Sequence, residues 1–161
     1  MPIDAAQFRA TLRLRAASVA IVTASDGERV HGMTVSDFAG VSLDPPLMLV
    51  CADKQSNTLP LIEAGRNFAV NLLGVGQEAL SDRFASKQHE WTRFEGLACE
   101  RFASGAPLIP GALANLDCRV VALHDAGDHV IVVGRVEAAR HMGGEPLLHW
   151  NGSYQRLAAK P

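Results

Sequence analysis

Two long runs of strand-forming residues place the strongest constraint on what this chain can fold into. Residues 114–126 (ANLDCRVVALHDA) and 128–141 (DHVIVVGRVEAARH) are rich in β-branched and other apolar residues, and Gly127 stands between them. Such side chains favour strands, and a glycine between two such runs is typical of a tight turn. The two runs predict a long hairpin, in which the strands are antiparallel.

Shorter runs of the same kind extend this pattern over the rest of the chain, with a hairpin turn signal at Asp26-Gly27. The expected shorter strands cover residues 18–24, 29–35, 47–51 and 67–73. Only short helices are indicated, one capped by Asp4, one capped by Thr58 and one over residues 77–84. The fold class predicted is mainly β (α+β), with short helices flanking the strands.

A closed or split antiparallel barrel is expected rather than an open sheet, because closing a sheet protects its edges. The 161 residues are enough for one domain, 1–161, with a substantial core. The formal net charge of -2 argues against nucleic acid or an anionic membrane as a partner. No apolar run approaches the ~18–20 residues of a membrane span. Arginines interrupt the N-terminal segment, which is not signal-like, so a cytoplasmic location is the default expectation.

Motifs for several common kinds of chemistry are missing from the sequence. There is no GxSxG or HExxH, and Gly74-Val75-Gly76 lacks the third glycine of a dinucleotide loop. Cys51, Cys99 and Cys118 form no CxxC pair and are expected to be reduced thiols, and no metal site is expected. Redox chemistry would then need an organic cofactor that the chain binds and orients.

The stretch from residue 33 to 43 is unusual for a strand because it carries several hydroxyl groups. On a strand, Thr34 and Ser36 would face one side and Asp37 the other. These hydroxyls could bind the polyol tail of a planar cofactor. The alternative is that they simply face solvent on an edge strand.

A second polar stretch leads directly into a predicted helix. Lys54, Ser56 and Thr58 precede or begin residues 59–65, and the free amides and dipole at a helix N-terminus favour an anion. The stretch could therefore bind a phosphate. Ser56 and Thr58 could instead serve only as helix caps, and Lys54 could be a solvated loop lysine.

The sequence GMTVSDFAGVSLDPPLMLVC, residues 32–51, resembles the flavin-binding signature of the short-chain flavin reductases, the reductase components of two-component monooxygenases. The resemblance continues in order through FAVNLL, RFASK, RFEGL, APLIPGALANLDCRV, GDHVIVVGRV and PLLHWNGSY. Each motif is weak alone, but their shared order over most of the chain is specific. The resemblance implies a homodimer of FMN-binding-type split β-barrels that binds FMN or FAD and uses NADH or NADPH.

The resemblance also implies particular site residues. The segment Thr34–Asp37 would lie along the flavin ring and ribityl chain, and the loop Ala52–Thr58 would hold the rest of the tail and the phosphate. His129 would lie near the flavin or nicotinamide and is the candidate catalytic residue. The implied flavin contacts are Thr34, Val35, Ser36, Asp37, Ser42, Ala52, Lys54, Ser56, Asn57, Thr58, Phe84 and Tyr154.

The expected reaction is hydride transfer from NADH or NADPH to flavin, with the reduced flavin delivered to a separate oxygenase. Stacking the two rings and excluding water would lower the barrier with little acid–base catalysis. Two alternatives stay open. One is a non-catalytic flavin carrier on the same barrel, and the other is a reductase whose tightly bound flavin reduces another acceptor.

Several residues also have a structural interpretation or depart from the family pattern. His129 could simply start a hairpin, Phe84 could be core, and Tyr154 could pack on the barrel. Arg83 and Arg93 are expected to be surface charges or contacts to a nucleotide phosphate. Trp91 is expected on an exposed segment that folds over the site or the dimer partner.

Three positions differ from what the family often has. Asp37 replaces a small neutral residue or serine, Gly40 replaces serine, and His149 replaces tyrosine. Because a carboxylate repels a phosphate, Asp37 is expected to reach ribityl hydroxyls or to point away.

Overall fold

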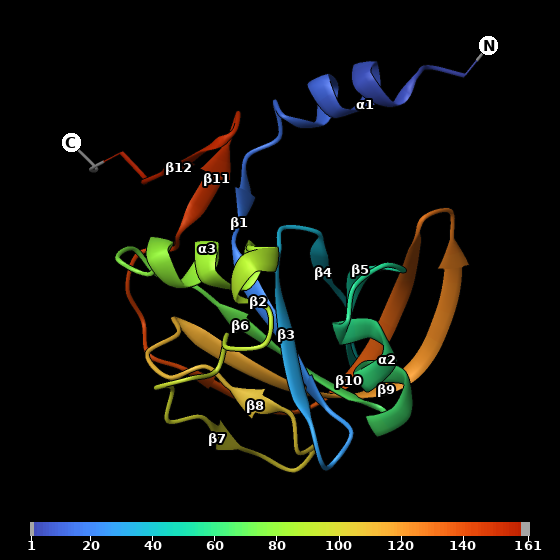
Figure 1. The fold of residues 1–161 in the computed structure, drawn as a ribbon, viewed down its shortest axis with the longest axis vertical. Coiled ribbons are helices and arrows are strands. Elements are labelled where there is room, and N and C mark those ends of the chain that lie inside the picture. The colour runs from blue at the N-terminus through green and yellow to red at the C-terminus, as the bar shows by residue number, and fades with distance from the viewer. Residues whose placement is uncertain (1, 159–161) are drawn as a thin grey trace.

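The computed structural model describes residues 2–158, which fold around one antiparallel sheet (Figure 1). Within these residues the main sheet has seven strands in the order β3-β2-β6-β9-β10-β5-β4. Its strands are β2 (Ala20–Ser25), β3 (Val30–Val35), β4 (Phe38–Leu43), β5 (Pro46–Asp53), β6 (Asn67–Leu72), β9 (Ala114–Ala126) and β10 (His129–His141). The smaller strands are β1 (Ala17–Ser18), β7 (Glu100–Arg101), β8 (Pro107–Leu108), β11 (Leu148–Trp150) and β12 (Ser153–Gln155). The helices are α1 (Ala5–Leu12), α2 (Thr58–Gly65), α3 (Glu78–Ala85) and the short 3-10 helix Lys87–His89.

The long hairpin predicted from the sequence is confirmed as β9 and β10, with Gly127 in the turn at φ 68°. Two register shifts interrupt this ladder, between Val133 and Gly134 and between Val136 and Ala138. Such bulges increase the bend and twist of a strand. Gly134 is required at this bend, because an added Cβ would lie 2.4 Å from Cε1 of Phe68.

The sheet curls into a split barrel. β3 and β4 stand at opposite ends of the strand order, yet only two residues separate them along the chain. Three residue steps can span at most about 11 Å, so the two ends of the sheet must approach each other. The hydroxyl-rich stretch is therefore not one strand, as predicted, but a bend at Ser36 and Asp37 between two sheet edges.

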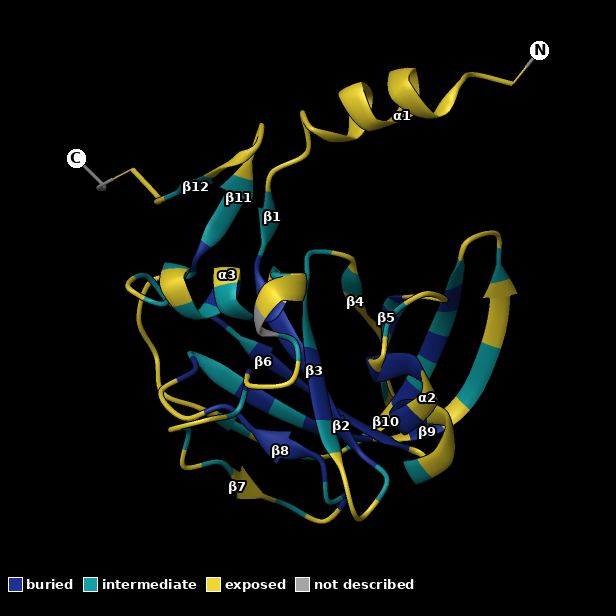
Figure 2. Ribbon diagram, viewed as in Figure 1, coloured by how far each residue is buried: buried dark blue, intermediate teal, exposed yellow. Residues whose placement is uncertain are grey.

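Two apolar clusters fill the interior of the barrel and its flank (Figure 2). The first lies among the main-sheet strands and α2 and includes the fully buried Val50, Ile62 and Phe68. The second includes Ile21 of β2 and Phe84 of α3, so the structural interpretation of Phe84 as a core residue is confirmed. The helices therefore close the barrel where the sheet leaves it open.

The N-terminal helix α1 projects away from the barrel, beside the β11–β12 hairpin (Figure 1). Its predicted cap is confirmed, because Asp4 Oδ1 accepts a hydrogen bond of 2.7 Å from the Gln7 amide. All of its residues are exposed, including Phe8 and Leu12. This helix thus adds nothing to the core of the single chain.

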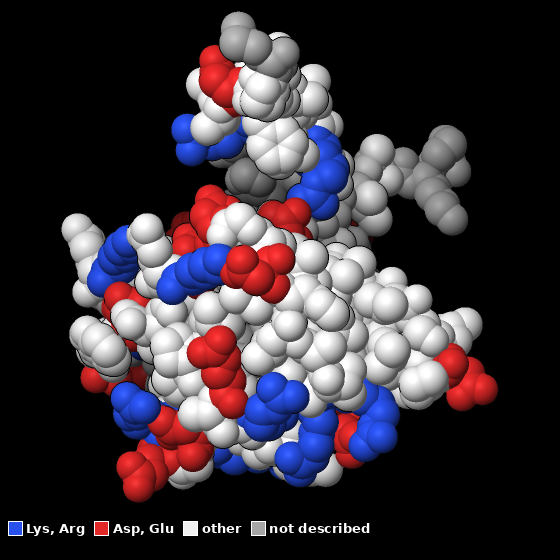
Figure 3. Space-filling view, turned by 90° about the vertical axis from the view of Figure 1, so that its right-hand side faces the viewer, with Lys and Arg blue, Asp and Glu red and all other residues white. Residues whose placement is uncertain are grey.

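The distribution of surface charge and the length of the helices bear on what the protein could bind or cross. Figure 3 shows basic and acidic side chains interspersed on one face, around a broad area without charged residues. Among residues 2–158, none of the helices has the length and apolar character needed to cross a membrane.

Candidate functional site

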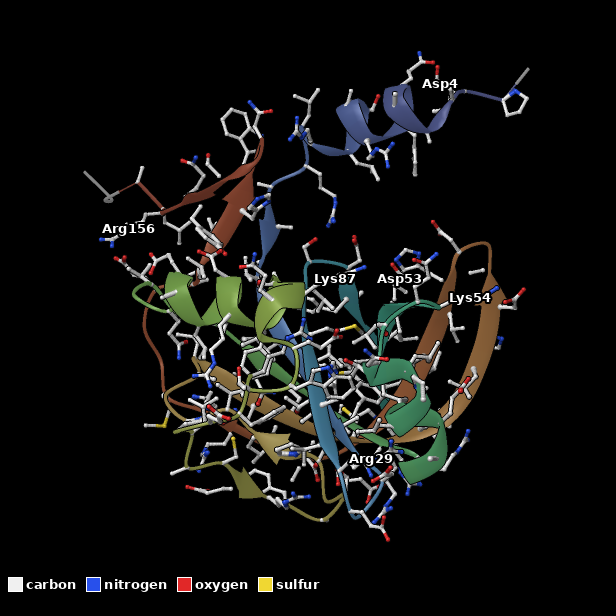
Figure 4. All side chains as sticks on the ribbon, in the orientation of Figure 1. Asp4, Arg29, Asp53, Lys54, Lys87 and Arg156 are labelled. Carbon is white, nitrogen blue, oxygen red and sulfur yellow. The ribbon has the colours of Figure 1, made fainter. Side chains whose placement is uncertain are left out.

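A hollow of about 370 Å³ lies between β3, the loop after β5, the end of α3 and the following segment, and is called here the β3–α2 hollow. Residues of the predicted flavin site meet at its wall. Those residues are Thr34, Ser56, Asn57, Thr58 and Phe84. Figure 4 shows Lys87 and Asp53, which also line the hollow, on the same side of the barrel.

The N-terminus of α2 forms one side of this hollow. The N-cap residue is Asn57, which makes no side-chain cap bond, so the prediction that Thr58 caps the helix is wrong. The capping role belongs to Ser56, whose Oγ accepts a hydrogen bond of 3.3 Å from the Leu59 amide. Thr58 is the first residue of α2. Its buried hydroxyl does not cap the helix, because it lies 2.8 Å from Nδ1 of His31 instead. The dipole and amides of this first turn favour an anion in the hollow.

Two nitrogens in the wall of the hollow lack hydrogen-bond partners. They are Nε2 of His31 and Nε of Arg93, both buried, and neither makes a hydrogen bond among the residues that the structure describes; the charged atom near Nε2 of His31 is Oε1 of Glu90, at 3.5 Å. Leaving a buried donor unpaired destabilises a protein by about 1–3 kcal/mol, so such atoms usually have a partner. An anionic ligand in the hollow would supply one.

Arg93 is not the surface charge that the sequence predicted. Its side chain is buried, and its two terminal nitrogens donate to backbone oxygens, Nη1 to Gly32 at 2.7 Å and Nη2 to Ser86 at 2.9 Å. These hydrogen bonds compensate for the loss of contact with water. Burial lowers the pKa of this guanidinium, while Glu90 nearby acts in the opposite direction. No sequence pattern predicts this burial, because the two carbonyls that Arg93 meets come from different parts of the chain.

The charge state of His31 is set by the same surroundings. Burial lowers the pKa of His31, and Arg93 lowers it further, against the opposing effect of Glu90. Oε1 of Glu90 lies 3.5 Å from Nε2 of His31 and 3.9 Å from Nη1 of Arg93. The guanidinium of Arg93 therefore partly offsets the charge of the Glu90 carboxylate, and Asp53 adds a second carboxylate to the same wall.

A second hollow, of about 330 Å³, continues from Thr34 and is called the Tyr154 hollow. Val35, Ser36 and Tyr154 of the predicted site line it. The Tyr154 hydroxyl donates to Oδ1 of Asp82 at 2.6 Å and lies 2.8 Å from Oγ of Ser81. Burial and the Asp82 carboxylate raise the pKa of Tyr154, so the phenol stays protonated at neutral pH.

Five other predicted residues line neither of these two hollows, namely Asp37, Ser42, Ala52, Lys54 and His129. Ala52 is fully buried, and Ser42 is half-buried on β4. Lys54 donates to the Gly127 carbonyl at 2.7 Å and forms an ion pair with Asp125. His129 also lies at this end of the β9–β10 hairpin, with Nδ1 2.7 Å from Oδ1 of Asp128.

Asp37 points toward the N-terminal segment. Its Oδ1 is 2.5 Å from Nη2 of Arg15, on the exposed bend between β3 and β4. This ion pair offsets the charge of the carboxylate on the segment that the resemblance assigns to the flavin.

The residues of the β3–α2 hollow fit a flavin phosphate. A helix N-terminus, two buried nitrogens that make no hydrogen bond and the Lys87 ammonium line one cavity, together with the carboxylates of Asp53 and Glu90. This cavity adjoins the Thr34–Asp37 segment. Sequence reasoning identified the helix and offered Arg93 as a contact to a nucleotide phosphate, but it did not single out His31 or Lys87. Lys87 and Arg93 stand within the RFASK and RFEGL motifs, which gave a signal of family but not of role.

Comparison with known proteins decides the family. Residues 12–158 match the family model described as "Flavin reductase like domain". This chain belongs to the flavin reductase family. The fold class expected from the sequence is confirmed as well, because the structural relatives are flavin reductases of the split-barrel type.

Individual family members match over nearly their full lengths. An FMN reductase (NADH) from Agrobacterium fabrum is 42% identical over 151 residues, covering 94% of this chain and 85% of that protein. The reductase component of 4-hydroxyphenylacetate 3-monooxygenase from Thermus thermophilus is 40% identical, covering 93% and 95%. The solved structure of an NADH:FAD oxidoreductase from Streptomyces globisporus has a TM-score of 0.91 and 35% identity, covering 99% and 96%.

Proposed function

We propose that this chain is an NADH-dependent flavin reductase that transfers a hydride to FMN or FAD and supplies the reduced flavin to a separate oxygenase. The observation that carries the proposal is the β3–α2 hollow, in which unpartnered nitrogens of two buried side chains meet a helix N-terminus. Family membership agrees with it, since relatives are named as NADH-dependent reductases and as a monooxygenase reductase component.

The chain's own residues would bind and orient the flavin. His31, Lys87, Arg93 and the first turn of α2 would hold its phosphate. The segment Thr34–Asp37 would lie along the ring and ribityl chain. The Thr34 hydroxyl already donates to the Ser81 carbonyl at 2.6 Å, so this segment would contact the flavin through its backbone groups. When bound, the flavin supplies a ring nitrogen that accepts hydride, and the protein excludes water and aligns the two rings.

His129 is proposed to contact the nicotinamide ribose or amide at the end of the β9–β10 hairpin. Its imidazole is partly exposed and lies next to the exposed carboxylate of Asp128, so it is accessible to a second substrate. Lys54, which follows β5 and donates to Gly127 in the turn of this hairpin, is proposed to approach the flavin tail. His129→Ala should change the KM or kcat for NADH, and unchanged values would assign it a structural role.

We also infer that the chain forms one domain, residues 1–161, and that two chains form a homodimer. The cytoplasm is its proposed location. Large apolar side chains are exposed on α1 and on the edge strand β4, including Phe8, Leu12, Val41 and Leu43. Unpaired sheet edges and apolar patches favour association with another chain. A mass measurement in solution tests this, and a monomer at micromolar concentration would refute it.

NADH oxidation by the purified protein, with and without added FMN, FAD or riboflavin, tests the proposed activity. A rate that rises with added flavin supports a flavin reductase. Bound flavin with negligible NADH oxidation would refute it in favour of a carrier. If NADH oxidation needs another acceptor and does not rise with added flavin, the protein is instead a reductase whose tightly bound flavin reduces that acceptor.

A further inference from the structure

A smaller hollow of about 140 Å³ adjoins the β3–α2 hollow and is called the Trp91 hollow. His31 and Asn57 line both hollows. Beyond these shared residues, the smaller hollow is lined by Arg29, Val30, Pro60, Leu61 and Trp91. The two cavities therefore follow one another along β3, from Thr34 toward Arg29.

The direction of this path is visible in the labelled side chains. Figure 4 shows Lys87 at the upper end of β3 and Arg29 near its lower end. A strand rises about 3.3 Å per residue, so the five steps from Thr34 to Arg29 span about 17 Å. With the flavin ring along Thr34–Asp37 and its phosphate in the first hollow, as proposed above, a ligand reaches the second hollow only if it continues beyond that phosphate.

Trp91 is a large apolar side chain that the core does not use. Its side chain is 82% exposed, and its ring meets the His31 ring edge-on at a centroid distance of 6.1 Å. The backbone around it is held in place by two arginines. Arg93 donates to Gly32 and Ser86, and Arg83 donates to the carbonyls of Thr92 and Glu95 at 2.5 and 2.7 Å.

The guanidinium of Arg29, a side chain that is 72% exposed, is paired with Asp26. Its Nε and Nη2 donate to Oδ2 of Asp26 at 3.0 and 2.7 Å. Hydrogen bonds from Arg29 lower the pKa of Asp26 to about 2, so the pair stays ionised at neutral pH. The hollow thus combines an indole, a planar cation and the apolar surface of Pro60 and Leu61.

We propose that the Trp91 hollow binds the adenine of FAD, and that the chain therefore prefers FAD to FMN. An adenine ring stacks on aromatic and guanidinium planes and buries little polar surface in doing so. FAD differs from FMN by an adenosine phosphate joined to the flavin phosphate, and the second hollow begins where the proposed phosphate site ends. The inference rests on the proposed function, since it assumes flavin in the first hollow.

Flavin titration followed by fluorescence tests the proposal. The wild-type protein should bind FAD about tenfold more tightly than FMN, and Trp91→Ala should raise the Kd for FAD about tenfold. The Kd for FMN should stay within about twofold, and Trp91→Phe should keep most of the FAD preference. Trp150→Ala, which removes the other tryptophan (43% exposed), is the matched control and should change neither Kd.

The outcomes separate this inference from the proposed function. If no flavin binds to the wild-type protein, both are overturned. If FMN and FAD bind equally well and Trp91→Ala changes neither, the proposed function stands and the FAD inference falls. If Trp91→Ala raises the KM for NADH and leaves both flavin affinities unchanged, the hollow takes the adenine of the pyridine nucleotide, which also overturns the inference. ADP should compete with FAD for binding to the wild-type protein but not to Trp91→Ala. This result would support the inference without any measurement of turnover.

Discussion

Two buried polar clusters of this molecule differ in how completely they are hydrogen-bonded. Asn71 donates to the Ile21 carbonyl at 2.9 Å, and its Oδ1 accepts from the Ile109 amide at 2.9 Å and from Asn115 at 2.8 Å. The cluster around His31 and Arg93, by contrast, keeps two nitrogens without partners in the described part of the chain. A satisfied network stabilises the barrel, whereas an unsatisfied one beside a cavity is prepared for a ligand.

The largest expected effect of a substitution is on the satisfied cluster. Asn71→Leu leaves the Ile21 carbonyl, the Ile109 amide and the Asn115 amide group without this partner in the interior. The free energy of unfolding should fall by about 4 kcal/mol, measured by urea denaturation. A loss below about 1 kcal/mol would show that the network does not hold the barrel together.

The second effect concerns flavin binding and is measured on variants shown to be folded, because Arg93 also donates to the carbonyls of Gly32 and Ser86. Arg93→Met removes a buried charge from the β3–α2 hollow, and the Kd for FMN should rise about 10- to 100-fold. Arg119→Met is the matched control, because Arg119 also donates to a backbone carbonyl, that of Ala103 at 2.9 Å, outside the hollow. Equal changes in FMN affinity for both variants would break the contrast between the two clusters.

A third effect follows from the pKa of His31. Because burial lowers the folded-state pKa below its ordinary value of 6.5, the unfolded chain binds more protons below that pH. Neutral His31 therefore favours the folded state above pH 6.5, and this contribution is lost as the pH falls toward the folded-state pKa. The stability of His31→Gln should depend less steeply on pH below 6.5 than that of the wild type, by at most about 1.4 kcal/mol per pH unit. Parallel curves from urea denaturation at several pH values would contradict this.

The smallest effect is expected at the exposed bend between β3 and β4. Arg15→Gln breaks the ion pair with Asp37, and the free energy of unfolding should change by less than about 1 kcal/mol. Salt should reduce the difference further, since both groups are exposed to solvent. A larger change that persists in high salt would mean that the N-terminal segment contributes more to the barrel than its exposure indicates.

The parts of the fold that the sequence predicted are those set by local chemistry. The turns at Asp26-Gly27 and Gly127 and the cap at Asp4 each depend on a few neighbouring residues, and all three are present. The family motifs extended these local signals to the split barrel. The strand order was not predicted, because pairing between distant strands leaves no short-range pattern.

The site was predicted in part for the same reason. The polar segments near Thr34 and Thr58 were identified from composition, and the structure brings them to one hollow. The contact between His31 and Thr58 joins residues 27 positions apart, and Arg93 meets the Gly32 carbonyl across 61 positions. A histidine in a strand and an arginine in a polar loop look like surface residues until the fold places them together.

The most direct test of the central claim compares FMN with riboflavin, which lacks the phosphate. If the unpartnered nitrogens of His31 and Arg93 and the first turn of α2 bind that phosphate, the wild-type protein should bind FMN at least about tenfold more tightly than riboflavin. Titration of both flavins by fluorescence in the same buffer gives the ratio. Equal affinities for FMN and riboflavin would contradict the assignment of the β3–α2 hollow to the flavin phosphate.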